Sequence, residues 1–231
     1  MSNQPLHIIY QDEYLVAIDK PAGHLVHPAS TPQDDDLVAM KILRDQIGHR
    51  VHSIHRLDRP TSGVLLFGIE KDTARKLHKS LADHEFEKHY LAAVTGKPDQ
   101  THWHCNEPIQ KEPAAPIREA HTVFQLLTSL DHPDAGTLSL IKATPHTGRF
   151  HQIRRHLIHH KLPIIGDYRY AGIERCDKLG STLGTGSRML LQAHQLTITH
   201  PVTEEVMKFT APLEPLIKKV FPNYDVNYDG V

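Results

Sequence analysis

Cysteine is scarce in this chain of 231 residues. The two cysteines, Cys105 and Cys176, are too few and too isolated for a disulfide framework or a four-cysteine zinc site. The sequence also lacks any run near the roughly 18 apolar residues of a membrane span, and its first residues lack the basic start and apolar core of a secretion signal. These absences favour a globular protein of the reducing cytoplasm, and we expect no association with a membrane.

An excess of positive charge is missing as well. Lys and Arg number 26 and Asp and Glu 27, so the formal net charge is −1. Non-specific binders of nucleic acid carry a strong positive excess, because neutralising phosphates supplies most of their affinity. Contacts to a nucleic acid would therefore have to come from local basic groups. The candidates are Arg149, Arg154, Arg155 and Lys161 in one segment and Lys41, Arg44 and Arg50 in another.

Histidine, in contrast, is abundant, with 20 residues. Four of them, His151, His156, His159 and His160, fall on one predicted helix, where positions four or five apart can bring two imidazoles together. The sequence offers neither a Cys-x-x-Cys nor a His-Glu-x-x-His arrangement to complete a zinc site. We therefore expect no bound metal.

The most informative segment is HRLDRPTSG at residues 55–63, in which Asp58 stands between Arg56 and Arg59. Nearby positive charge stabilises an ionised carboxylate, so Asp58 is suited to act as a nucleophile or a base rather than as a proton donor. Pro60 fixes its own φ and the closing glycine permits a turn, which predicts a stiff loop. A surface Arg-Asp ion pair that closes a turn before a strand is the structural alternative.

The same segment resembles the HRLDxxTSG signature of the RluA family of pseudouridine synthases. Three further blocks resemble that family in the family's order: residues 8–23, which end in Lys-Pro-Ala-Gly; residues 88–96 (KHYLAAVTG); and residues 147–156 (TGRFHQIRRH) with 163–167 (PIIGD). Together the four blocks span most of the chain.

This resemblance implies an α+β fold with a mixed, largely antiparallel sheet, flanking helices and a central RNA-binding cleft. We expect one pseudouridine synthase catalytic domain over residues 1–231, without a separate S4 domain. The implied activity is isomerisation of a specific uridine in RNA to pseudouridine, without a cofactor. The sequences of three segments are most similar to those of family members that act on tRNA, which implies that the substrate is a uridine in the T-stem. A uridine of large-subunit rRNA is the alternative substrate.

The resemblance also assigns catalytic roles, to Asp58, Tyr90 and Arg154. Asp58 would attack C1′ or C6, or remove a ribose proton. Tyr90 has an aromatic face that can stack on an unstacked base and a hydroxyl that can move a proton, although a strand tyrosine can equally pack on its sheet. Arg154 would pair with the aspartate through its fork of donors, with Arg149 as the alternative.

A second group of residues is implied to contact RNA or the base: Arg56, Arg59, Arg149, Ile153 and Leu191. Arg56 would fill the space that a flipped base leaves, and Ile153 or Leu191 would wall the base pocket, although both would look the same as plain core residues. One position departs from the family. Gln192 stands where relatives often have histidine, and we expect it to alter a supporting hydrogen bond.

Two other classes of function remain as alternatives. A catalytically silent RNA-binding module would hold RNA without isomerising it, and the complete set of Asp58, Tyr90 and Arg154 argues against it. A hydrolase with paired carboxylates is disfavoured because the motif places no second acid beside Asp58. We expect a monomer.

Hydrophobic periodicity predicts the secondary structure. We expect a helix over about 37–47 with Asp34, Asp35 and Asp36 as N-cap candidates, and a loop or insertion at 99–118. Residues 180–186 predict a flexible turn. The remaining predicted elements are strands at 7–10, 14–18, 63–69, 90–95, 120–127, 137–143, 189–199 and 205–210, and helices at 72–83 and 151–160.

Overall fold

The computed structural model describes residues 4–225 except 29, 30, 32, 34 and 35. Its contacts divide the chain into two compact units. Unit 1 combines the chain up to Glu87 with Ala193–Pro212, and unit 2 combines Lys88–Gln192 with the chain from Leu213 onward. The predicted single domain and central cleft concern both units together, so they stay predictions, and each unit is described by itself.

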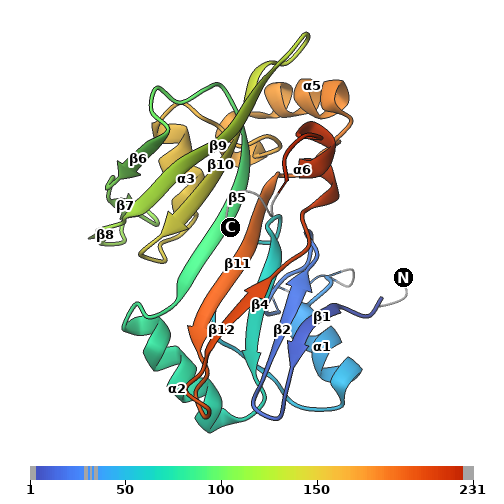
Figure 1. Ribbon diagram of the computed structural model, residues 1–231, viewed down its shortest axis with the longest axis vertical. Helices are drawn as coiled ribbons and strands as arrows, with labels where there is room; N and C mark the ends of the chain where they lie inside the picture. Colours follow the sequence, from blue (N-terminus) through green and yellow to red (C-terminus); the bar gives the residue numbers. More distant parts are fainter. Residues whose placement is uncertain (1–3, 29–30, 32, 34–35, 226–231) are drawn as a thin grey trace. The chain divides into compact units, whose positions relative to one another are not determined.

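Unit 1 is built on a sheet flanked by two helices, α1 (Ala39–Ile47) and α2 (Lys71–Ala82) (Figure 1). Ala74 and Leu77 of α2 pack in one buried cluster with Leu66 of the sheet. The hydrogen-bonded order of the strands is β1-β2-β4-β11, with β12 beside β11 and β3 beside β4. The strands are β1 (His7–Gln11), β2 (Leu15–Lys20), β3 (His52–Ser53), β4 (Ser62–Gly68), β11 (Leu191–Thr199) and β12 (Val206–Thr210).

The start of α1 differs from the prediction. Val38 occupies the N-cap position and makes no side-chain cap bond. Asp36 instead accepts a hydrogen bond from the Gln33 amide at 3.0 Å and pairs with Arg59 at 3.3 Å. It is therefore a loop residue rather than a helix cap. Asp34 and Asp35 lie outside the described residues.

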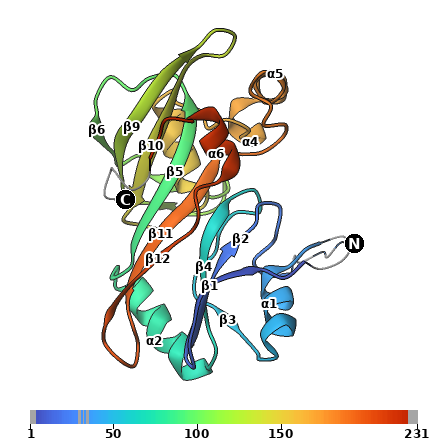
Figure 2. The same ribbon diagram turned by 45° about the vertical axis from the view of Figure 1, so that its right-hand side comes forward.

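Unit 2 is built on four strands in the order β5-β10-β9-β6, each antiparallel to its neighbour (Figure 2). These strands are β5 (Glu87–Thr95), β6 (His102–Cys105), β9 (Thr122–His132) and β10 (Gly136–Pro145), and two short strands, β7 (Ile109–Gln110) and β8 (Ile117–Arg118), pair separately. The helices of unit 2 are α3 (Gln152–His159), α4 (Tyr168–Ala171), α5 (Ile173–Leu183) and α6 (Pro215–Val220).

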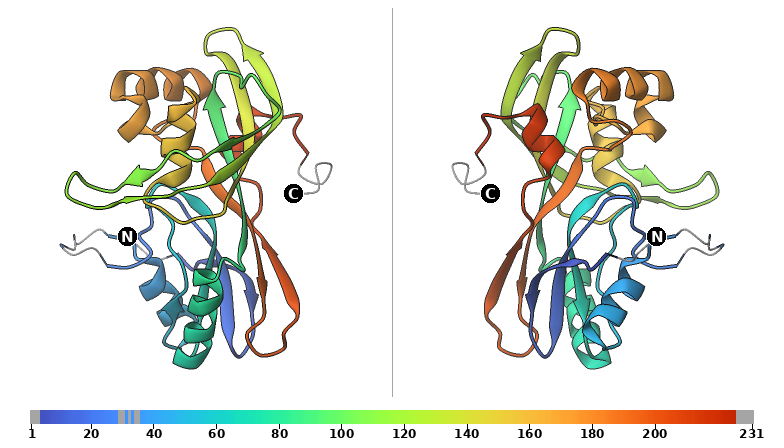
Figure 3. Two further views of the ribbon diagram at one scale, coloured as in Figure 1. Left: turned by 90° about the vertical axis from the view of Figure 1, so that its left-hand side faces the viewer. Right: turned by 90° about the vertical axis from the view of Figure 1, so that its right-hand side faces the viewer.

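Residues of β5 alternate between two hydrophobic clusters, as the twofold period of a strand requires. Ala92 and Val94 belong to a cluster that contains Leu157 of α3. Leu91 and Ala93 belong to a cluster that contains Ile217 of α6. The helices α3 and α6 therefore cover opposite faces of this sheet (Figure 3).

Two loop predictions were wrong. The segment 99–118 contains β6, in which buried Trp103 and Cys105 alternate with exposed histidines, together with β7 and β8. The segment 180–186 was predicted as a flexible turn, but α5 continues to Leu183. Gly180 is buried there, and a Cβ at this position would lie 2.2 Å from the Gly186 carbonyl oxygen. This glycine permits close packing rather than flexibility.

The other predicted strands and helices are confirmed, most of them within a few residues at their ends. Among the described elements, the sequence also missed the helices α4, α5 and α6 and the short strand β3. The pairs β1–β2, β2–β4, β3–β4 and β11–β12 of unit 1 and the strand pairs of unit 2 are antiparallel. The neighbouring strands β4 and β11 run in the same direction (Figure 1), and one isolated bridge, between Leu25 and Val38, is parallel. The predicted α+β class is therefore confirmed. No helix in the described part of the chain is long and apolar enough to cross a membrane.

Candidate active site

Asp58 of unit 1 lies in the short connection between β3 and β4. Its carbonyl oxygen accepts a hydrogen bond from the Thr61 amide at 3.0 Å, which closes a tight turn just before β4 begins. The neighbouring Leu57 and Thr61 are buried, whereas Asp58 itself is half-buried. The loop is thus anchored on both sides of a carboxylate that keeps partial access to solvent.

Lys20, at the end of β2, holds this loop from the other side. It is fully buried, and its Nζ donates to the carbonyl oxygens of Pro21 and His24 at 2.9 Å each and of Arg59 at 3.4 Å. A buried ammonium is costly unless such partners surround it. The Gly23 amide also donates to the Arg59 carbonyl at 2.8 Å. The backbone immediately after Asp58 is therefore fixed to the Lys-Pro-Ala-Gly segment.

The two arginines of the motif have different surroundings. The Arg59 Nε donates to the Gly23 carbonyl at 3.0 Å, and its guanidinium pairs with Asp36 at 3.3 Å. The Arg59 side chain therefore contacts both Gly23 and Asp36. Arg56 is exposed, as its predicted contact with RNA requires.

In unit 2 the structure brings together three residues that were predicted around the base. Ile153 of α3 and Leu191 are buried in one hydrophobic cluster, and Tyr90 of β5 packs against the same cluster. Tyr90 is half-buried and faces Ala143 across the β5–β10 pair. The same contacts are those of plain core residues, so the role of these three residues around the base stays a prediction.

Arg154 of α3 makes a buried ion pair that the sequence analysis missed. Its Nε and NH2 donate to the two carboxylate oxygens of Asp167 at 2.8 and 2.7 Å, and the side chains are 6% and 2% exposed. The guanidinium carbon also lies 5.0 Å from the centre of the Tyr170 ring. Asp167 is the last residue of the PIIGD block, and its place in that block was the signal in the sequence that could have singled it out. The predicted pairing of Arg154 with Asp58 joins residues of different units and stays a prediction.

Gln152 organises the loop that leads into α3. Its Oε1 accepts hydrogen bonds from the Thr147 hydroxyl at 2.7 Å and the Arg149 amide at 3.0 Å. Its Nε2 donates to the His121 carbonyl and to Thr122 Oγ1 at 2.9 Å each. The Arg149 side chain bonds with the Glu119 carbonyl at 2.9 Å, so the alternative arginine stabilises the same loop.

Several histidines of unit 2 have structural surroundings. The rings of His121 and His146 stack with centroids 4.7 Å apart, and His121 Nε2 hydrogen-bonds with His104 Nδ1 at 3.2 Å. Burial and these two neighbours lower the pKa of His121. Burial also lowers the pKa of His156, whose ring nitrogens bond with Thr122 Oγ1 at 2.9 Å and the Glu107 carbonyl at 3.0 Å. Both are therefore neutral at pH 7.

Gln192, the departure from the family pattern, is buried at 1% exposure and accepts a hydrogen bond from the Glu214 amide at 3.1 Å. The glutamine thus supports the backbone at the start of the last segment of unit 2. Among the described residues, no group of three or more His, Cys, Asp or Glu side chains is arranged to hold a metal ion.

Comparison with known families identifies the class of protein to which this site belongs. Residues 14–159, which include Asp58, Tyr90 and Arg154, match the RNA pseudouridylate synthase family. The chain belongs to this family, whose members are isomerases that convert uridine in RNA to pseudouridine. The predicted RluA-type membership is confirmed.

Individual relatives show which members of the family this chain resembles. The chain is 36% identical to tRNA pseudouridine synthase C of Yersinia pestis, over 89% of this chain and 86% of the relative. It is 38% identical to the enzyme of the same name from Haemophilus influenzae, over 90% and 93% of the two chains. Among solved structures, human RNA pseudouridylate synthase domain containing 4 shares 25% identity and a TM-score of 0.73 over 93% of this chain and 92% of its own. Human RNA pseudouridylate synthase domain containing 1, at 22% identity, has a TM-score of 0.74 over 93% and 86%.

Proposed function

We propose that this protein isomerises one uridine in the T-stem of tRNA, near the junction with the acceptor stem. The observation that carries the proposal is the similarity to relatives named tRNA pseudouridine synthase C, which extends over 86% and 93% of their own length. The presence of Asp58, Tyr90 and Arg154 at the positions that match the family's motifs supports it.

The reaction is balanced without any co-reactant. The bond between N1 of uracil and C1′ of the ribose breaks, the base turns, and a new bond forms between C5 and C1′. The proton lost from C5 is matched by the proton that N1 gains. The proposed chemistry therefore needs groups that bind the base, stabilise charge and move a proton, and no cofactor or metal.

The proposed roles follow from the chemistry of each side chain. Asp58 reacts at C1′ or at C6, or removes a ribose proton. Tyr90 stacks on the freed base and takes the proton from C5. Arg154, held by Asp167, supplies a fixed positive charge to the site. The target uridine is flipped out of its stack, and the exposed Arg56 takes its place.

We further propose that the protein acts as a monomer in the cytoplasm. A uridine of large-subunit rRNA is the alternative substrate, because the RNA-facing loops rather than the catalytic motif select the target. A silent RNA-binding module is the alternative class, and it predicts that loss of the Asp58 carboxylate has no effect on RNA modification.

The test is carbodiimide labelling and primer extension on total RNA from three strains. One lacks the gene, one is restored with the wild type and one with Asp58→Asn. We expect one tRNA position to lose its pseudouridine signal in the deletion strain and to regain it only with the wild type. Loss of an rRNA signal instead would show that the substrate is rRNA rather than tRNA. No change in any RNA would contradict the proposed function.

A further inference from the structure

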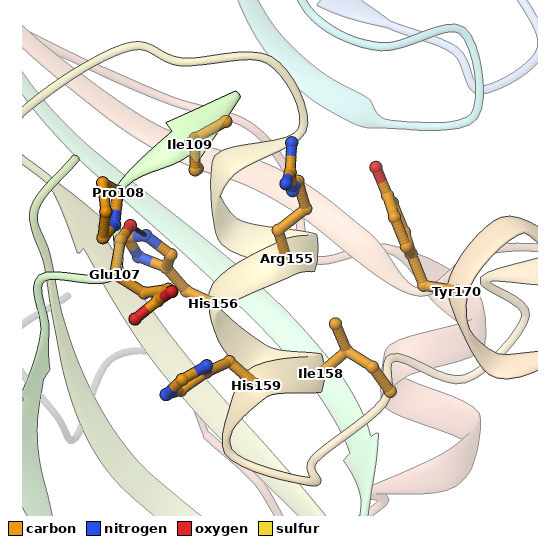
Figure 4. Close-up of a pocket in the computed structure, with 8 residues that line it drawn as sticks. All are labelled: Glu107, Pro108, Ile109, Arg155, His156, Ile158, His159 and Tyr170. Carbon is orange, nitrogen blue, oxygen red and sulfur yellow. Dashed lines mark hydrogen bonds between the residues drawn. The ribbon is translucent and has the colours of Figure 1, made fainter. Parts of the chain in front are cut away.

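A pocket in unit 2 lies outside the group of residues predicted to hold the target base. It is formed between α3, the residue Tyr170 of α4, and the segment that leads into β7 (Figure 4). Its volume is about 310 Å³, which is at the lower end of the range for small-molecule sites. This size fits a single nucleoside better than a larger ligand.

The lining combines an apolar base with two oriented groups. Ile158 and the buried Ile109 supply aliphatic surface, while the side chains of Arg155 and Tyr170 point in the same direction (Figure 4). The NH1 of Arg155 donates to the Gln110 carbonyl at 2.7 Å. The Tyr170 hydroxyl bonds with His151 Nδ1 at 3.0 Å. Both side chains are therefore held in place before any ligand arrives, which lowers the entropic cost of binding.

Tyr170 connects this pocket to the candidate active site. Tyr170 lines the pocket, and the centre of its ring lies 5.0 Å from the guanidinium carbon of Arg154. Arg154 and Arg155 are consecutive residues of α3, with Arg154 buried and Arg155 half-buried. A ligand in the pocket would thus contact the same ring as the site arginine. The geometry is that of a neighbouring subsite.

The charges favour an anionic ligand on the side of Arg155. The carboxylate of Asp167 is already paired with Arg154, so it does not offset Arg155. The exposed Arg169 adds a second positive charge, 6.0 Å from the centre of the Tyr170 ring. The acidic Glu107 lies beside His156, away from Tyr170 (Figure 4).

We propose that this pocket binds a nucleotide of the RNA substrate that adjoins the target uridine and is unpaired from the stem when the target is flipped out. Its base stacks on the Tyr170 ring and against Ile158, as unpaired bases do on aromatic and arginine side chains. Arg155 donates a hydrogen bond to the edge of the same base. The proposal rests on the proposed function, because it assumes that RNA is the substrate.

The experiment is a cycle of protein and RNA changes measured by pseudouridine formation. tRNA transcripts each carry one abasic nucleotide at a position flanking the target. With the wild type, we expect kcat/KM to fall about tenfold for one abasic position, the size of one lost base contact. Arg155→Ala should lose a similar factor on intact RNA and almost nothing more on that abasic RNA, because both changes remove one interaction.

Lys161→Ala is the matched control, since it removes an exposed positive charge just beyond α3. On each abasic RNA, the loss in kcat/KM for Lys161→Ala should equal its own loss multiplied by the loss from that abasic position. Thermal unfolding checks that both variants are folded. The pocket assignment would be overturned if the losses in kcat/KM from Arg155→Ala and from the abasic nucleotide multiplied at every position. Full activity of Arg155→Ala on intact RNA would overturn it as well. Absence of conversion by the wild type would instead contradict the proposed function, and this inference with it.

Discussion

The buried pair of Arg154 and Asp167 is the strongest single-residue test of the structure. Replacing Asp167 with asparagine keeps the shape but leaves a buried guanidinium without its counter-charge. Breaking such a pair costs about 3–5 kcal/mol, and we expect this loss in the free energy of unfolding from urea denaturation. The exposed Asp134→Asn, in the same unit, should change it by less than about 0.5 kcal/mol. A loss below about 1 kcal/mol for Asp167→Asn would contradict the buried pairing.

At the scale of residues, the sequence motifs supplied the chemical groups and the fold supplied their partners. The segment HRLDRPTSG points to Asp58 without any structure because it resembles the family signature, whereas charge and spacing alone also fit a surface ion pair that closes a turn. The partner of Arg154 could not be predicted in the same way. Asp167 lies 13 residues away, and only the turn after α3 brings it under the guanidinium. For the same reason the three carbonyl partners of Lys20 were not foreseen.

Gly63, in β4, tests how closely two strands of unit 1 approach. Its φ is +108°, and a Cβ there would lie 2.1 Å from the Ala193 carbonyl oxygen of β11. Gly48 has a φ of +71° with nothing within 4 Å of its Cβ position, so Gly48→Ala should cost only the backbone strain of about 1–2 kcal/mol. Gly63→Ala adds a backbone clash, and we expect a loss of about 4 kcal/mol or more. Equal losses in denaturation experiments would show that the two strands are not in contact.

At the scale of elements, most long periodic segments were predictable, whereas the short ones and the 11-residue helix α5 were not. The strand β10 and the helices α2 and α3 match their predictions because each buries several of its apolar residues, whereas β9 continues to His132, beyond its predicted end at about 127. The segment 99–118 was misjudged because histidines occupy the exposed positions of β6, so its alternation around Trp103 and Cys105 did not stand out. Helices of four and six residues, such as α4 and α6, are determined by their surroundings rather than by their own periodicity.

For the whole molecule, the histidines predict how stability depends on pH. Burial is the largest cause that lowers the pKa of six of them: His24, His27, His52, His121, His156 and His160. A group with a lower pKa in the folded state binds protons more readily when unfolded, so the free energy of unfolding falls as pH drops below about 6.5. Above that value, these groups contribute no pH dependence.

Urea denaturation at pH 7.5, 6.5 and 5.5 measures this effect. We expect the urea concentration at the midpoint of unfolding to be lower at pH 5.5 than at pH 6.5. His156→Gln should make this difference smaller, because it removes one buried imidazole. His49→Gln, at an exposed position, is the matched control and should leave the difference unchanged. A urea midpoint that rises on acidification in the wild type would contradict the lowered pKa values of these six histidines.

The most direct test of the central claim is release of tritium from tRNA labelled at C5 of uridine. Formation of pseudouridine expels the C5 hydrogen, so purified wild-type protein should release one tritium per target uridine. Asp58→Asn should slow the release by roughly 1,000-fold or more, because a group that acts directly in the chemistry is removed, while its affinity for the tRNA stays near that of the wild type. Release by Asp58→Asn at the wild-type rate would contradict the assignment of Asp58 as the catalytic residue.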